Sequence, residues 1–398
     1  MLGINSNINS LVAQQNLTGS GSALSQAITR LSSGKRINSA ADDAAGLAIS
    51  NIMQTQINGL NQGVSNSNDG VSLVQTASSG LSSLTNSLQR IRQLATQAAN
   101  GSMTSNDRAA LQQEVSQQVS EINRVASQTT YNGMNVLNGT LGTVSFQVGA
   151  NVGQTISLNL TQNMSAASIG SGVPQAGNTL GTFTGLSLTS AGATAAASAA
   201  TITSINVVSD GSGGFSFTDQ NNQALSQTAV GNLFTATGNA SSGGGAFQGS
   251  GTAVTLTDGG MSAAAAAAAG AAGSAAAAAA AVAMENQIAS YNKPTTVASV
   301  DISTASGASM AMESIDNALT TLNNLQATLG AAQNRFTAIG TTQQAQSTDL
   351  STAQSSIQDA NFAAETANLS KAQVLQQAGI SVLAQANSQP QQILKLLQ

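Results

Sequence analysis

Two helices are predicted to meet at Leu31-Ser-Ser-Gly-Lys-Arg-Ile-Asn-Ser-Ala-Ala-Asp-Asp-Ala-Ala-Gly46, close to the start of the chain. Before this stretch, apolar residues recur at helical spacings, with Gln, Asn and Ser between them. The periodicity stops between Ser32 and Ser39. Ser39-Ala-Ala-Asp42 then resembles a capping box, and Asp42 and Asp43 suit the positive end of a following helix dipole. The stretch therefore predicts a joint between a first and a second helix.

The second predicted helix carries a long apolar seam and runs to about residue 99, where Asn100-Gly101 ends it. Its seam consists of Leu60, Val64, Val71, Val74, Leu81, Leu84, Leu88, Ile91, Ala95 and Ala98. A third helix is expected to begin near Asp107, with its own apolar face. Because the connecting loop is short, the third helix should lie antiparallel to the second.

The middle of the chain changes from helical to β-like patterns. Alternating apolar residues predict a β-hairpin, with Val144, Phe146 and Val148 on one strand and Ile156, Leu158 and Leu160 on the other. Residues 166–260 are rich in Gly, Ser, Thr and Ala, which indicates a small separate domain containing β-strands. The Ala-rich tract from Ser262 to about Ile288 has very high helix propensity and is expected to form one helix.

The coiled-coil pattern returns after Lys293-Pro294, with apolar residues seven apart at Ile315, Leu322, Leu329 and Phe336. The sequence thus predicts a mainly α protein. Long heptad helices from both chain ends form coiled-coil-like domains, with a β-hairpin and a central inserted outer domain that contains β-strands and the Ala-rich tract. Apolar seams at both termini are a liability in a monomer, so they predict packing against other copies.

The composition removes most enzyme and nucleic-acid functions. Only 7% of the residues are charged, against about 25% in typical soluble proteins. The chain has no His, Cys or Trp, so it lacks imidazole bases, thiol nucleophiles, zinc-finger ligands and disulfides. The net charge is −5, and no Lys or Arg lies between Arg124 and Lys293, so the chain is unsuited to a phosphate backbone. We expect no metal, no cofactor and no nucleic-acid partner.

Weaker motifs have simple structural explanations. Gly34-Lys35 lacks both the upstream Gly and the following Ser or Thr of a phosphate loop. Four carboxylates lie at predicted helix starts, where the helix dipole accounts for them: Asp42, Asp43, Glu313 and Asp316. The longest apolar segment, residues 263–283, is interrupted by glycines and lacks Leu, Ile and Phe, so we expect no membrane insertion. We predict no catalytic residues and no enzyme activity.

Motifs at both ends of the chain resemble the terminal signatures of bacterial flagellins. Besides Leu31 to Gly46, the N-terminal ones are Asn66-Ser-Asn-Asp-Gly70, Leu88-Gln-Arg-Ile-Arg-Gln-Leu94 and Tyr131-Asn-Gly-Met-Asn-Val-Leu137. The C-terminal ones are Leu329-Gly-Ala-Ala-Gln-Asn-Arg-Phe336 and Leu369-Ser-Lys-Ala-Gln-Val-Leu-Gln-Gln-Ala-Gly-Ile-Ser-Val-Leu-Ala-Gln-Ala-Asn387. The resemblance covers residues 1–165 and 297–398, while the centre resembles no family that we can name.

The resemblance implies an extracellular subunit of the bacterial flagellar filament, exported by the flagellar type III apparatus and used for motility. It implies an inner filament-core domain made of residues 1–42 and 356–398. Residues 43–165 would form a helical domain with the β-hairpin, 297–355 its return helix, and 166–296 a variable outer domain. The implied partners are further copies in a helical homopolymer, the flagellar cap and hook-junction proteins, an export chaperone and Toll-like receptor 5.

Two sets of residues are candidate sites. The terminal seams predict self-assembly through Ile4, Ile8, Leu11, Leu24, Ile28, Leu31, Val374, Ala378 and Val382. Counting in both directions from the loop near Met103 places Arg90 and Glu114 at similar heights on antiparallel helices, so we expect an ion pair. Together with their neighbours they also resemble the patch by which Toll-like receptor 5 detects flagellins, which implies an innate-receptor site at Leu88, Gln89, Arg90, Leu94 and Glu114.

Two other functions stay open: a hook-filament junction protein with related ends, and a surface adhesin related to flagellin. The match at both ends, including Lys371 to Asn387, favours the main filament subunit over a junction protein. An adhesin would need exposed aromatic or charged residues in the centre. That region offers only scattered phenylalanines that serve equally well in a core: Phe183, Phe215, Phe217, Phe234 and Phe247.

Overall fold

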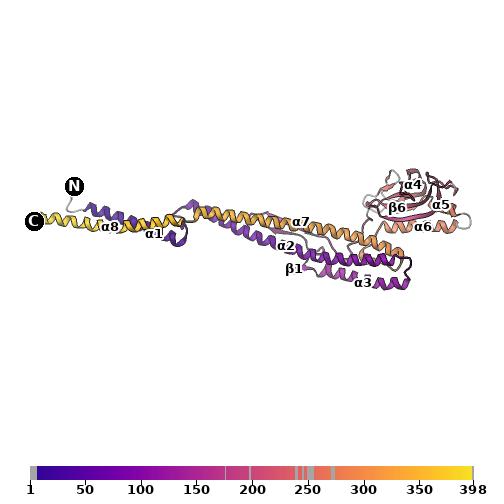
Figure 1. The fold of residues 1–398 in the computed structure, drawn as a ribbon, viewed down its shortest axis with the longest axis horizontal. Coiled ribbons are helices and arrows are strands. Elements are labelled where there is room, and N and C mark those ends of the chain that lie inside the picture. The colour runs from indigo at the N-terminus through magenta and orange to yellow at the C-terminus, as the bar shows by residue number, and fades with distance from the viewer. Residues whose placement is uncertain are drawn as a thin grey trace. The chain divides into compact units, whose positions relative to one another are not determined.

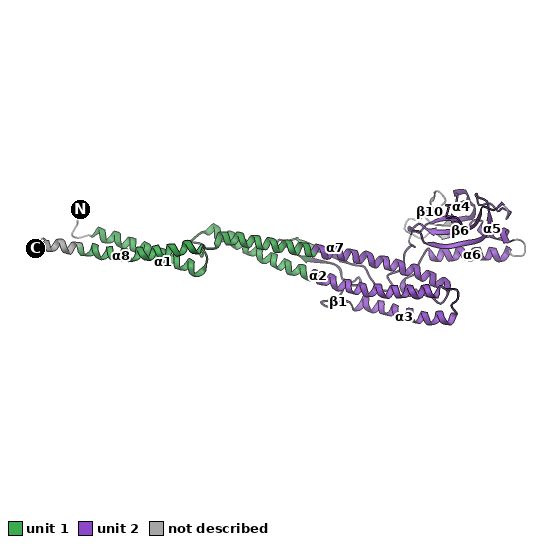
Figure 2. Cartoon of the chain, in the orientation of Figure 1, with its two compact units in different colours: residues 1–69, 146–156, 336–398 green, residues 70–145, 157–335 purple. Residues whose placement is uncertain are grey.

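The computed structural model describes residues 7–174, 176–196, 199–237, 241–243, 246–248, 255–269 and 274–396. The chain divides into two compact units, coloured separately in Figure 2. Unit 1 comprises residues 1–69, 146–156 and 336–398, and unit 2 comprises residues 70–145 and 157–335. The fold is mainly α-helical with small antiparallel sheets, as the sequence predicts.

Unit 1 begins and ends with two helices that lie side by side, α1 (Ile8–Ser33) and α8 (Phe362–Leu396) (Figure 1). The side chain of Asn7 caps α1 by accepting a hydrogen bond from the Ser10 N–H. Gly34 ends the helix in the left-handed conformation, with φ at +71°, which glycine adopts without steric cost. The predicted end of the first helix is therefore confirmed.

The predicted joint is confirmed, and a second break between two helices lies beside it. Asp43 accepts a hydrogen bond from the Gly46 N–H at the start of α2 (Ala44–Ala98). Lys35 forms an isolated β-bridge with Asp359, just beyond the end of α7 (Ala305–Gln358). The Arg36 guanidinium donates to the Ile357 carbonyl at 2.6 Å. An Arg at this position suits the negative end of the α7 dipole and links the two breaks.

The predicted hairpin pairs β3 (Gly142–Gln147) with β4 (Thr155–Leu160). Its tip lies on the unit 1 part of α2, where two glycines leave room for its backbone. A Cβ built at Gly63 would lie 2.2 Å from the Val148 carbonyl oxygen, and one at Gly59 would lie 2.8 Å from the Ala150 Cβ. Asn66 donates to the Gln147 carbonyl at 2.7 Å and holds the strand in place.

In unit 2, the C-terminal half of α2 lies beside α3 (Ser105–Gln128) and the N-terminal half of α7 (Figure 1). The predicted heptad residues fill this core: Leu81, Leu84, Leu88, Ile91, Ile315, Leu322 and Leu329 are at most 1% exposed. Thr104 and Asp107 form a capping box at the start of α3. After α3, β1 (Thr130–Tyr131) and β2 (Met134–Asn135) pair across a tight turn.

The rest of unit 2 is a small domain built on a five-stranded sheet of order β5-β6-β7-β10-β9. Its strands are β5 (Thr179–Leu188), β6 (Ile202–Ser209), β7 (Phe215–Asp219), β9 (Ser241–Gly243) and β10 (Ala246–Gln248). A second pair joins β8 (Phe234–Thr237) to β11 (Thr255–Asp258), with α4 (Gln227–Leu233) preceding β8. All five central phenylalanines are buried here, so they are core residues.

The prediction of one helix over the Ala-rich tract is wrong. The tract forms two helices that pack side by side, α5 (Met261–Ala269) and α6 (Ser274–Tyr291). Propensity favours a single helix, but Gly270 and Gly273 each cost about 1 kcal/mol relative to Ala. Folding back lets both helices contact β5 and bury Met261, Ala264, Ala281 and Ile288. A short 3-10 turn, Val297–Ser299, then leads to α7.

Candidate assembly surface and other candidate sites

The contact between α1 and α8 is a seam in which small residues alternate with larger ones, mostly leucines. Buried and half-buried positions recur at alternating spacings of three and four, as in a heptad repeat. On α1 they include Ser10, Ala13, Leu17, Ser20, Leu24, Ala27 and Leu31, and on α8 they include Glu365, Leu369, Ala372, Gln376, Gly379, Leu383 and Ala386. We call this set the terminal seam. Small side chains let two helices approach closely but bury little apolar area.

Polar contacts fix the register at one end of the terminal seam. Asn7 donates to the Ala386 carbonyl at 2.8 Å, and the Ser10 hydroxyl donates to the Asn387 side chain at 2.7 Å. Gly379 faces Leu17 so closely that an added Cβ would lie 3.2 Å from the Leu17 Cδ1. The two chain ends therefore pair in one defined alignment.

A second set of apolar residues on α1 and α8 is exposed to solvent. It consists of Ile8, Leu11, Val12 and Ile28 on α1, and of Phe362, Val374, Leu375, Ile380 and Val382 on α8. Their exposed fractions run from 50% to 69%. We call these nine residues the exposed terminal face. Fully burying one large aliphatic side chain is worth about 1.5–3 kcal/mol, so covering this face would contribute on the order of 10 kcal/mol.

The structure divides the predicted self-assembly residues between these two sets. Ile8, Leu11, Ile28, Val374 and Val382 belong to the exposed terminal face, and Ala378 is exposed beside them. Leu24 and Leu31 are half-buried in the terminal seam, so they hold the two helices together within one chain. Ile4 lies outside the described residues. Sequence reasoning missed Val12, Phe362, Leu375 and Ile380, because heptad counting assigned all apolar residues to a single face.

The candidate receptor residues lie on α2 and α3 in unit 2. The expected ion pair is formed: the Arg90 Nε donates to the Glu114 Oε1 at 2.7 Å, with side chains 48% and 36% exposed. Gln89 is exposed, whereas Leu88 and Leu94 are 0% and 2% exposed and lie inside the core. Only the three polar residues can therefore contact a partner directly, and the two leucines position them.

A neighbouring ion pair joins α2 to α7. Arg92 binds both carboxylate oxygens of Asp316, at 2.6 and 3.1 Å. This hydrogen bonding, with the nearby charge of Asp316, raises the pKa of Arg92 above its ordinary value. The Thr96 hydroxyl donates to the sulfur of Met312 one turn along. Asp316 thus has a structural role at this contact.

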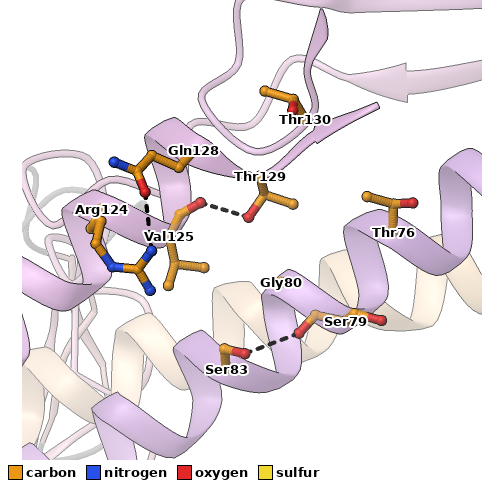
Figure 3. A pocket seen from close by; sticks show the side chains of 9 residues that line it. All are labelled: Thr76, Ser79, Gly80, Ser83, Arg124, Val125, Gln128, Thr129 and Thr130. Atoms are coloured by element: carbon orange, nitrogen blue, oxygen red, sulfur yellow. Dashed lines mark hydrogen bonds between the residues drawn. The ribbon is translucent and has the colours of Figure 1, made fainter. Parts of the chain in front are cut away.

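A groove of about 570 Å³ lies between α2 and α3 (Figure 3). Its lining is rich in hydroxyl groups, with Thr76, Ser79, Gly80 and Ser83 from α2, and Arg124, Val125, Gln128, Thr129 and Thr130 from the end of α3 and beyond. The Ser83 and Thr129 hydroxyls donate to backbone carbonyls of their own helices. Arg124 is held by Gln128 and Glu121. These two hydroxyls are therefore bound to main-chain oxygens rather than to a base that could activate them.

The part of the chain that the structure describes shows neither a metal-binding cluster nor a membrane-spanning helix. Within it, no three His, Cys, Asp or Glu side chains gather closely enough to hold a metal ion. Among the same residues, no helix combines the length and the apolar character needed to cross a membrane.

Three family models match the chain in succession. The bacterial flagellin N-terminal helical region matches residues 4–141, the flagellin D2 domain matches residues 172–318, and the bacterial flagellin C-terminal helical region matches residues 312–397. The D2 match covers most of the central segment that resembles no family by its motifs. The matched family therefore accounts for the outer domain as well as for both ends.

Curated relatives match along their whole length. The B-type flagellin of Pseudomonas aeruginosa is 39% identical, and the alignment covers 100% of this chain and 99% of that protein. Flagellin B of Vibrio cholerae serotype O1 is 34% identical, with coverage of 100% and 99%.

A solved flagellin structure gives the same result for the fold. The structure of FliC from Burkholderia pseudomallei is 57% identical, with a TM-score of 0.59, and the match covers 67% of this chain and 99% of that one. The flagellar junction protein FlgL from Legionella pneumophila matches at 16% identity and a TM-score of 0.40, covering 78% of this chain and 100% of that one. That second likeness is too distant to support a junction role.

Proposed function

This chain belongs to the bacterial flagellin family, and from that premise we propose that it polymerises through the exposed terminal face. As a flagellin it is a structural subunit of the extracellular flagellar filament, which serves motility. We propose three further things: which residues make the contacts between copies, which role each domain has, and which other partners bind the chain.

One observation carries the proposal: the exposed large apolar side chains of the described residues concentrate in unit 1. All of them except Met134 and Val282 belong to this unit. Besides the exposed terminal face they include Ile49, Ile52 and Val152. Soluble monomers rarely leave so much clustered apolar surface uncovered, whereas a homopolymer covers it with the next copy.

We assign the five segments accordingly. Residues 1–42 and 356–398 would form the inner core of the filament, because the terminal seam pairs them and the exposed terminal face lies on them. Residues 43–165 and 297–355 would form the helical domain with its hairpin, and 166–296 the variable outer domain. The low charge of the chain suits dense packing of copies, because few ionic groups would need to be desolvated.

The same reasoning extends to other partners. The exposed terminal face is a surface that an export chaperone would cover before assembly, and that cap and hook-junction proteins would meet at the filament ends. We assign Gln89, Arg90 and Glu114 as the receptor-facing residues for Toll-like receptor 5, with Leu88 and Leu94 behind them. The family is structural, and we assign no catalytic role, since hydroxyl groups such as those of Ser83 and Thr129 bond to backbone carbonyls rather than to a base.

A seeded polymerisation assay tests the assembly surface. The double variant Leu11→Ser, Val374→Ser removes one apolar side chain from each helix of the exposed terminal face. Since each loses on the order of 1 kcal/mol of burial, the critical concentration should rise about 10-fold to 100-fold. The matched control is Val282→Ser, which makes the same change at a 42% exposed valine of the outer domain. Equal critical concentrations for both variants would refute the assignment.

A further inference from the structure

The outer domain buries a carboxylate without a cationic partner. In α6, the residues facing the domain core include Ala281, Glu285 and Ile288, which are 5%, 4% and 0% exposed. Glu285 therefore occupies a position that elsewhere on this face belongs to an apolar side chain. Its Oε1 atom is buried and accepts no hydrogen bond among the described residues. An ionised carboxylate in this position is strongly disfavoured.

The surrounding charges also disfavour ionisation of Glu285. The helix α6 packs against α5, β5 and β11. Residues 261–269 of α5 and 179–188 of β5 contain no ionisable group, and Asp258 at the end of β11 is a carboxylate. Residues 166–292 contain no Lys or Arg at all. Burial, together with the charge of Asp258, raises the pKa of Glu285 to about 7.

Asp258 is a fixed negative charge, because it is already hydrogen-bonded. Its carboxylate accepts from the Gly260 N–H at 2.8 Å, from the Ser262 N–H at 3.2 Å and from the Ser262 hydroxyl. Burial works against its ionisation, but these bonds outweigh burial and lower the pKa of Asp258. Its oxygens cap the start of α5 and are not free to help neutralise Glu285. A proton is then the simplest neutralising partner for Glu285.

We propose that Glu285 is a proton-binding site that controls how tightly α6 closes over the outer domain. The neutral acid fits the apolar face of the sheet, whereas the carboxylate is desolvated and repelled by Asp258. The closed helix holds the proton more strongly than the open one. The stabilisation is therefore complete below the ordinary pKa of Glu, 4.5, and is lost as the pH rises to about 7.

The opening should spare the C-terminal end of α6. The C-terminal end of α6 is anchored, because Asn292 donates to the Gly213 carbonyl at 2.9 Å and the Tyr291 hydroxyl donates to the Ser306 carbonyl at 3.2 Å. Near the middle, Gly181 of β5 gives Met284 and Ile288 room to pack closely against the strand. Glu285 lies between Met284 and Ile288 in the sequence, so its ionisation would loosen this middle contact while the C-terminal end stays anchored.

Hydrogen exchange of the full-length monomer tests the proposal. Peptides from residues 274–291 are compared with α2 peptides from residues 81–98 in the same sample, which correct for the intrinsic pH dependence of exchange. Between pH 5.5 and 8.0, the corrected opening equilibrium of α6 should rise about 30-fold, by linkage of one group with pKa values of 4.5 open and about 7 closed. This range stays above the isoelectric point of about 4.5.

Two isosteric variants separate the proposal from a general charge effect. Glu285→Gln should remove the pH dependence whatever its effect on absolute stability. Asp219→Asn removes one charge elsewhere in the same domain and should leave the dependence intact. The proposal is overturned if wild-type α6 shows no dependence, if Glu285→Gln retains it, or if Asp219→Asn abolishes it. Protection by added Ca²⁺ at pH 8 that depends on Glu285 would also overturn it, in favour of a cation site.

Discussion

Substituting alanine for Gly63 should separate close backbone contact from helix propensity. Gly63 lies in the interior of α2, where replacing Gly by Ala ordinarily stabilises a helix by about 1 kcal/mol. Here the new Cβ would lie 2.2 Å from the Val148 carbonyl oxygen and 2.8 Å from its carbon. Backbone atoms cannot rotate away as a flexible side chain can, so the tip of the hairpin has to move.

The size of the loss in stability follows from the contacts that this movement of the hairpin tip disturbs. Overpacking a tight contact costs about 1–3 kcal/mol. Displacing the tip also weakens the 2.7 Å bond from Asn66 to the Gln147 carbonyl, worth about 0.5–1.5 kcal/mol. After subtracting the gain in propensity, we expect Gly63→Ala to lower the free energy of unfolding by about 1–3 kcal/mol.

Chemical denaturation of the monomers measures this effect. The matched control is Gly330→Ala in α7, where an added Cβ meets nothing within 4 Å. It should raise stability by about 0.5–1 kcal/mol through propensity alone. The two glycines are thus expected to respond with opposite signs. A Gly63→Ala protein as stable as wild type, alongside a stabilised Gly330→Ala protein, would show that the hairpin does not rest on α2 as described.

Three further outcomes are expected. Arg90→Ala should weaken binding of the monomer to Toll-like receptor 5 by about 2 kcal/mol in a direct binding assay, while the melting temperature changes little, because the pair is half exposed. A deletion joining Ala167 to Val297 should still form filaments by electron microscopy, and failure to assemble with the helices intact would contradict the assignment of an outer domain. Hydrogen bonds from the Thr104 side chain and backbone lower the pKa of Asp107, so this capping box stabilises α3 above pH 3.8 and loses its effect as the pH falls through the lowered value. Thr104→Ala should reduce that acid sensitivity in a pH titration of helix content.

The sequence predicts those features that depend on local chemistry. Gly34 and the capping groups near Asp43 mark the joint, since a glycine in the left-handed region and an N-terminal carboxylate are local requirements. Leu322 and Leu329 are buried because a heptad repeat specifies one face of a helix. The pairing of Arg90 with Glu114 follows from counting along antiparallel helices joined by a short loop.

The rest depends on contacts between distant segments. The strand order β5-β6-β7-β10-β9 cannot be deduced from runs of Gly, Ser and Thr, because such strands only weakly specify their register. Helix propensity gives no sign that the Ala-rich tract folds back on itself. The heptad pattern also cannot separate the two faces of α1. Leu24 and Ile28 lie only four residues apart, yet Leu24 is half-buried in the terminal seam and Ile28 is 51% exposed.

The composition of the terminal seam explains why polymerisation and ordering of the chain ends should be coupled. The apolar residues of the seam that are fully buried are Ala13, Ala27, Ala372 and Ala386, each of which buries only a methyl group, and its leucines are only half-buried. Such a seam specifies register but contributes little free energy, and an isolated helix pair is marginally stable in water. Other large apolar side chains, such as Leu11 and Val374, lie outside the seam and are mostly exposed, so we expect another copy to cover them. Each added copy would therefore supply the free energy that orders the helices of its neighbours, which makes the ends protease-sensitive in the monomer and resistant in the filament.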